Sequence, residues 1–150
     1  ETRVLHYLEV LRDEIGWDKV RAAVTHPLTG KKIGAYYGCM LLRPSCEMQL
    51  DDPENPQILE DFIRAIGAEP VIYAQRNECC GGYMTVENKR YAAKQAQRIA
   101  DDAAAQGAEL LITACPLCMY NLTQNTEKKL PVVYFTELLA QALGCGEEDA

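Results

Sequence analysis

Five cysteines fall at three places in this chain of 150 residues, and their spacing favours metal binding. Cys79 and Cys80 are adjacent and are followed by two glycines. A disulfide between neighbours would be strained, so two adjacent thiolates that face one soft metal or metal cluster make better chemical sense. The glycines allow positive φ and close approach of the backbone to a bound group. The other three are Cys39 and the ends of a Cys-Pro-Leu-Cys sequence, Cys115 and Cys118.

Composition narrows the class of protein. The total of seven cysteines is odd, and no secretion signal is recognisable, which favours a reducing compartment and metal binding over a disulfide scaffold. We therefore expect a cytoplasmic protein. The net charge of −7 argues against a nucleic-acid partner. No apolar run approaches the about 18 residues of a membrane span, so no span is expected.

Apolar periodicity, turn residues and strand-forming runs predict the elements that position these cysteines. The first helix should place Val4, Leu8, Leu11 and Ile15 on one face. The expected helices cover residues 2–16, 18–24, 57–66, 85–107, 116–129 and 136–143, with Thr85 and Thr136 as N-caps of the fourth and sixth. The expected strands cover residues 33–37, 70–74, 110–113 and 132–134. Prolines and an acidic pair predict a loop over residues 43–56.

The alternation of strands and helices predicts an α/β fold, with a mostly parallel four-stranded sheet flanked by helices. In such sheets ligands bind beyond the carboxyl ends of the strands. Cys39, the Cys79–Cys80 pair and Cys115 each directly follow an expected strand. The cysteine loops should therefore meet at one edge of the sheet.

The full cysteine pattern resembles the CCG, or cysteine-rich, domain found in the B subunit of heterodisulfide reductase and in its relatives. The resemblance covers about residues 34–144 and is closest to the second of two copies that such subunits carry. It implies a segment of residues 1–30 that leads, as helices, into a single cysteine-rich domain over residues 31–150. Beyond the cysteines it rests on Tyr36-Tyr37-Gly38-Cys39, Leu42-Arg43-Pro44, Asn121-Leu122 and Pro131 through Leu139.

The resemblance implies a noncubane [4Fe–4S] cluster. Its ligands would be Cys39, Cys79, Cys80, Cys115 and Cys118. The cluster irons would bind and reductively cleave a disulfide such as CoM-S-S-CoB, with each half held on iron as a thiolate. Because soft iron binds soft sulfur, the cluster itself would carry out this chemistry, and no catalytic side chain is assigned. The chain is therefore expected to be an oxidoreductase component.

The same resemblance implies partners. These are an N-terminal cysteine-rich half of the same subunit, a ferredoxin-like iron–sulfur subunit and, through it, a flavin-containing subunit. A chain with one copy would lack half of the substrate site, so it is not expected to be active alone.

Two other interpretations remain open. The first is a structural zinc site in a docking module of a redox complex. Four thiolates are enough for zinc, so the fifth favours iron–sulfur. Aerobic purification would be able to strip a cluster and leave zinc or empty thiols. The second is an iron–sulfur component of a complex that oxidises lactate, glycolate or glycerol-3-phosphate. The Tyr-Tyr-Gly-Cys and Leu-Arg-Pro sequences favour the heterodisulfide reductase branch over this alternative.

The remaining candidate residues have ordinary explanations. We interpret Cys46 as a free cysteine, with a sixth ligand or a resolving thiol as the alternatives, and Cys145 as incidental. His6 and His26 are expected at the surface. Arg43 either steers an anionic substrate or forms a salt bridge within its loop.

Overall fold

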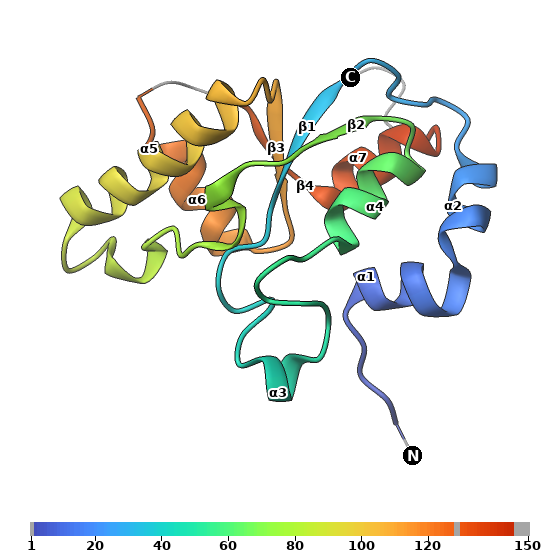
Figure 1. Cartoon of the computed structure of the whole chain (residues 1–150), viewed down its shortest axis with the longest axis horizontal. Coiled ribbons are helices and arrows are strands. Elements are labelled where there is room, and N and C mark those ends of the chain that lie inside the picture. The colour runs from blue at the N-terminus through green and yellow to red at the C-terminus, as the bar shows by residue number, and fades with distance from the viewer. Residues whose placement is uncertain (1, 128–129, 146–150) are drawn as a thin grey trace.

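The strands of the computed structural model, which describes residues 2–127 and 130–145, form one parallel sheet (Figure 1). The strand order is β2-β1-β3-β4, and every neighbouring pair is parallel. Gly34 in the central strand β1 lies opposite Val71 on one side and Leu111 on the other. The predicted α/β fold is thus confirmed. The bounds are β1 (Lys32–Tyr36), β2 (Glu69–Val71), β3 (Leu110–Thr113) and β4 (Val132–Tyr134).

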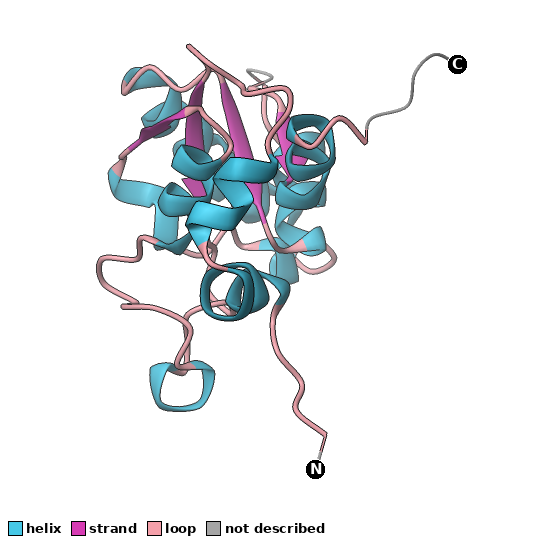
Figure 2. Cartoon of the chain, turned by 90° about the vertical axis from the view of Figure 1, so that its right-hand side faces the viewer, coloured by secondary structure: helices cyan, strands magenta, loops and turns pink. Residues whose placement is uncertain are grey.

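Helices cover both faces of this sheet, as Figure 2 shows. Their bounds are α1 (Tyr7–Glu9), η1 (Val10–Ile15, a π-helix), α2 (Trp17–Ala23), α3 (Ser45–Met48), α4 (Ile58–Ala65), α5 (Lys89–Ala105), α6 (Pro116–Gln124) and α7 (Phe135–Ala142). Two short 3₁₀ turns, η2 (Ala74–Asn77) and η3 (Gly82–Met84), flank the Cys79–Cys80 pair.

The core has two parts, one on each face of the sheet. On one face α4 and α7 pack with the N-terminal helices, and the buried Leu8, Leu11 and Val20 belong to this cluster. On the other face α5 and α6 pack against Tyr36 and Leu111. The buried side of α5 is rich in alanine, which allows the helix to approach closely. The division of the chain near residue 30 stays a prediction.

The first helix begins later than its apolar pattern predicts. Residues 2–6 are not helical, and Val4 is 93% exposed rather than part of the packed face. His6 forms the N-cap: its Nδ1 accepts from the backbone N–H of Leu8, and the Glu9 carboxylate accepts from the N–H of His6. This reciprocal capping box supplies a start signal that apolar spacing alone does not contain.

Both predicted threonine caps are wrong. Asn88 caps α5, with its Oδ1 accepting from the N–H of Tyr91 at 3.0 Å. Thr85 instead donates its hydroxyl to the carbonyl of Gly82, inside a turn that the prediction did not include. Helix α7 begins at Phe135, one residue before Thr136.

Other elements also differ from prediction. Strand β2 ends at Val71, because the chain then turns into η2, where the carbonyl of Arg76 accepts from the N–H of Tyr37. Helix α6 ends at Gln124 rather than 129, and residues 128–129 lie outside the described part. The loop over 43–56 contains the single turn α3. Within the described ranges, every helix is too short or too polar to cross a membrane.

Candidate metal centre

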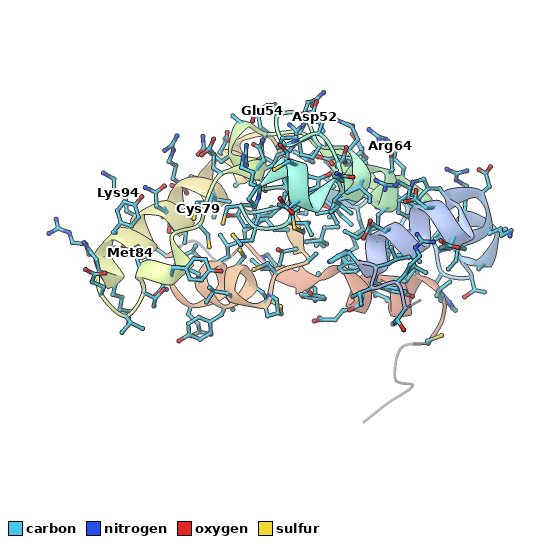
Figure 3. All side chains as sticks on the ribbon, turned by 90° about the horizontal axis from the view of Figure 1, so that it is seen from below. Asp52, Glu54, Arg64, Cys79, Met84 and Lys94 are labelled. Atoms are coloured by element: carbon cyan, nitrogen blue, oxygen red, sulfur yellow. The ribbon has the colours of Figure 1, made fainter. Side chains whose placement is uncertain are left out.

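All five predicted ligands line one cavity of about 30 Å³ beyond the carboxyl ends of β1 and β3. Figure 3, in which Cys79 is labelled, shows sulfur atoms gathered in this part of the molecule. Cys80 and Cys118 are buried, Cys39 and Cys115 are half-buried, and Cys79 is exposed. The lining is completed by Tyr37, Met40, Leu41, Gly82, Tyr83 and Leu117. The predicted meeting of the three cysteine loops is therefore what the structure contains.

Three different local structures deliver the thiols. Cys39 follows β1 after a turn at Gly38, whose φ is +67°. Cys115 is the N-cap of α6, and Cys118 lies in the first turn of that helix. The Cys79–Cys80 pair does not directly follow β2, contrary to prediction, because η2 lies between them.

Backbone N–H groups point at the sulfur atoms. The N–H of Gly82 donates to Cys80 Sγ at 3.3 Å, and that of Gly81 donates to Cys79 Sγ at 3.4 Å. In the same way the N–H of Cys118 donates to Cys115 Sγ at 3.4 Å. Such donors stabilise the negative charge of thiolates and of metal-bound sulfur.

Side chains fix the backbone of the Cys79–Cys80 loop. The fully buried Asn121 on α6 donates from Nδ2 to the carbonyl of Cys80 at 2.7 Å. The hydroxyl of Tyr36 donates to the carbonyl of Glu78 at 2.7 Å. Two elements of the domain, α6 and β1, thus hold the loop from either side.

Cys118 interacts with both Cys80 and Cys115, and this changes the pKa values of all three thiols. Hydrogen bonding from Cys118 lowers the pKa of both Cys80 and Cys115 to about 6. The same two bonds, together with burial, raise the pKa of Cys118. Burial, and then the neighbouring Cys79, raise the pKa of Cys39. At neutral pH the site therefore presents thiolates at Cys80 and Cys115, which is the form that metals bind.

The surroundings of the thiols fit a soft metal group. A Cβ at Gly38 would lie 3.0 Å from Cys118 Sγ, and one at Gly82 would lie 3.3 Å from Cys80 Sγ, so glycine leaves these sulfurs room. The cavity itself has space for about one or two water-sized atoms. Anything larger would have to spread the loops that carry the more exposed Cys39 and Cys79.

The arrangement is less suited to a single ion. Among residues 2–127 and 130–145, no three cysteine, histidine or acidic side chains are placed to hold one metal ion. A zinc ion needs four ligands at about 2.0–2.3 Å from one point.

The other candidate residues lie away from this cavity. Cys46 and Cys145 are exposed, and neither lines it. His26 is exposed as expected, whereas the half-buried His6 serves as a helix cap. Arg43 forms the salt bridge within its loop, with Nη2 lying 3.1 Å from Glu54 Oε1.

Sequence reasoning missed a buried polar group beside the cavity. Glu60 is fully buried, and it contacts Tyr37 and the nearly buried Arg76. In the sequence, Glu60 stands next to Asp61 on an amphipathic helix, where a charge ordinarily faces solvent. A pairing between two residues 16 positions apart leaves no periodic signal.

Comparison with known proteins adds family relationships. The family model described as "CCG: Cysteine-rich domain" matches residues 33–123. The B subunit of a ferredoxin/F(420)H(2)-dependent CoB-CoM heterodisulfide reductase from Methanosarcina acetivorans is 29% identical over an alignment of 158 residues, which covers 97% of this chain and 52% of the relative.

Two further relatives have different names. The 8-methylmenaquinol:fumarate reductase membrane anchor subunit of Wolinella succinogenes is 29% identical over 136 residues, covering 85% of this chain and 48% of the relative. A protein of Archaeoglobus profundus, described as like the B subunit of heterodisulfide reductase, is 27% identical over 157 residues. The alignment covers 95% of this chain and 52% of the relative. The chain therefore spans about half the length of these curated relatives.

Proposed function

This chain belongs to the cysteine-rich (CCG) domain family, and on that premise we propose that it is the cluster-binding domain of a protein like the B subunit of heterodisulfide reductase. Its cofactor would be a noncubane [4Fe–4S] cluster, and its reaction the reductive cleavage of a disulfide such as CoM-S-S-CoB. The observation that carries the proposal is the cavity lined by all five thiols. The ligands would be Cys39, Cys79, Cys80, Cys115 and Cys118.

When bound, the cluster would supply soft iron sites and the capacity to pass electrons to a sulfur–sulfur bond. The residues of the chain hold and shape that site. The N–H groups of Gly81 and Gly82 would stabilise the negative charge on the ligand sulfurs. The buried Cys80 and Cys118 would anchor the inner side, and the exposed Cys79 would mark the side open to a substrate.

The rim of the cavity supports an organic disulfide as the substrate. Met40, Tyr83 and Leu117 line the cavity and are also exposed, by 57%, 70% and 36%. Apolar side chains at a mouth of this kind suit the carbon skeleton of a thiol compound. Cleavage consumes two electrons and two protons and yields two thiols, so the electrons must come from a partner.

Partners follow from the same proposal. The chain spans about half of its relatives, so an N-terminal cysteine-rich half would complete the substrate site. A ferredoxin-like iron–sulfur subunit and a flavin-containing subunit would deliver electrons. The exposed apolar rim supports coverage by another protein surface, because exposed patches of this kind mark interaction sites.

Thiol binding to the loaded chain tests this function directly. The chain is reconstituted with iron and sulfide without oxygen, oxidised, and mixed with coenzyme M. We expect an iron-based EPR signal that appears with coenzyme M and not with its S-methyl derivative, which lacks the free thiol. A loaded chain whose spectrum is the same with both compounds would contradict the proposal.

A further inference from the structure

A buried carboxylate lies one side chain away from the cysteine cavity. Glu60 on α4 has no exposed surface, and its Oε2 accepts a hydrogen bond from the hydroxyl of Tyr37. Tyr37 lines the cavity and stands two residues before Cys39. Glutamate is rarely buried completely, so a role beyond helix formation is indicated.

The charge of this carboxylate is only partly compensated. Its Oε1 lies 3.1 Å from Nε of Arg76, and the two side chains are 0% and 11% exposed. The geometry is that of an ion pair rather than an aligned hydrogen bond, and within the described residues neither atom has a hydrogen-bond partner. The buried hydroxyl of Tyr73 is also without such a partner in this part of the chain.

Several charged and titratable groups act on Glu60 or on its tyrosine neighbours. Desolvation raises the pKa of Glu60, and the hydrogen bond from Tyr37 is the largest of the opposing effects. The groups are Tyr37 at the end of β1, Arg76 on η2, Tyr73 between β2 and η2, Arg64 on α4 itself, and, acting on the two tyrosines, Asp51 and Asp102.

Glu60 also has a connection to the surface. Nη2 of Arg76 donates to Oδ1 of Asn55 at 2.8 Å, and Asn55 is exposed. The line from solvent to the cavity thus runs from Asn55 through Arg76, Glu60 and Tyr37. Because an arginine side chain stays protonated and does not relay protons, small movements of Asn55 and Arg76 would admit water, and the water would carry a proton to the carboxylate without unfolding of the core.

We propose that Glu60 takes up one proton when the group held by the five cysteines takes up one electron. The proposal rests on the function proposed above. The electron comes from an external donor of low potential, such as dithionite or another iron–sulfur protein, and the proton comes from solvent. No bond to carbon or sulfur changes, and the net charge of the buried region stays constant. That constancy matters because uncompensated buried charge is costly.

The test is the pH dependence of the reduction potential of the reconstituted chain. If one proton is taken up per electron, the reduction potential should fall by about 59 mV per pH unit. This is the potential that corresponds to a tenfold change in an equilibrium constant for one electron. The slope should be present between the pKa values of Glu60 in the oxidised and reduced states. In Glu60→Gln it should be absent over the same range. Asp61→Asn is the matched control on the same helix: Asp61 is half-exposed and pairs with Arg64, so its loss should shift the position of the sloping range and leave the slope itself present.

A second variant keeps the test decisive if Glu60→Gln does not fold. Tyr37→Phe removes the hydrogen bond that lowers the pKa of Glu60, so the sloping range should move to higher pH. Carbon NMR of the Glu60 carboxyl in the unloaded chain should show the same upward shift.

The possible failures can be told apart. A slope that survives in Glu60→Gln, or a native potential independent of pH, would overturn the role of Glu60 and leave the cluster intact. A chain that binds no iron would overturn both proposals.

Discussion

The sulfur atoms of Cys80 and Cys118 lie 3.6 Å apart in the interior, although 38 residues separate them in the sequence. This contact joins the loop between η2 and η3 to the first turn of α6. It also places two soft donors together where solvent does not compete for them. The remaining ligands are arranged around this pair, which makes it the structural centre of the site.

Oxidation of the metal-free chain should link this pair. With glutathione disulfide as the oxidant, the two thiols lose two protons and two electrons, and two glutathione molecules are released. Peptide mapping should find the bond between Cys80 and Cys118, because their sulfurs are already in contact and a Cys79–Cys80 bond would be strained. Cys46→Ser should give the same product. A bond mapped mainly to the adjacent pair would contradict the geometry.

Replacing Gly38 by alanine should impair metal loading. The new Cβ would lie 3.0 Å from Cys118 Sγ, and the positive φ adds about 1–2 kcal/mol of strain. Gly107→Ala is a matched control, since its φ is also positive and nothing lies within 4 Å of its Cβ. Both variants should unfold at lower urea concentration, and only Gly38→Ala should lose most of its iron. Equal iron in the two would show that crowding at Cys118 has no effect.

Replacing Asn121 by alanine should loosen the Cys79–Cys80 loop. The buried carbonyl of Cys80 would lose its donor, at a cost of about 1–3 kcal/mol in the free energy of unfolding. Asn88→Ala removes the cap of α5 at a similar cost, about 1 kcal/mol, and Asn88 does not line the cavity. Urea unfolding should show a loss of stability in both variants. The iron content should separate the two variants, because only Asn121→Ala should lower the iron bound per folded chain. Unchanged iron in Asn121→Ala would contradict the role given to Asn121.

Alkylation of Cys115 in the unloaded chain should depend on pH in a specific way. Its pKa is lowered to about 6 by the hydrogen bond from Cys118, so the reactive thiolate is present at neutral pH and is lost as pH falls through about 6. The rate with iodoacetamide, followed by mass spectrometry, should reach half its plateau there. In Cys118→Ala the midpoint should move to higher pH, because the donor is gone. The same midpoint in both chains would exclude a hydrogen bond from Cys118 as the cause of the lowered pKa of Cys115.

Much of the site could be predicted from the sequence, because only a few interactions determine where the thiols lie. Strands β1 and β3 follow from short apolar runs, and parallel topology brings Cys39 and Cys115 to one edge of the sheet. The path from β2 to the Cys79–Cys80 pair was not predictable. Within η2 the carbonyl of Arg76 accepts from the N–H of Tyr37, and a pairing between distant parts of the chain leaves no local pattern.

The starts of helices and the position of the buried charge were also not predictable from local sequence patterns. Asn88 and Thr85 are both good cap residues, and the choice depends on a turn at Gly82 that the helix pattern does not reveal. The burial of Glu60 depends on Tyr37 and Arg76, which come from other elements. Local pattern therefore predicts where thiols gather, whereas tertiary pairing decides what surrounds them.

The most direct test of the central claim is the iron, zinc and acid-labile sulfide content of chain purified without oxygen. We predict about four irons and four sulfides per chain. Cys80→Ala should lose them, and Cys46→Ser, at an exposed cysteine outside the cavity, should keep them. One zinc with no sulfide, or full iron in Cys80→Ala, would contradict a cluster held by the five cysteines.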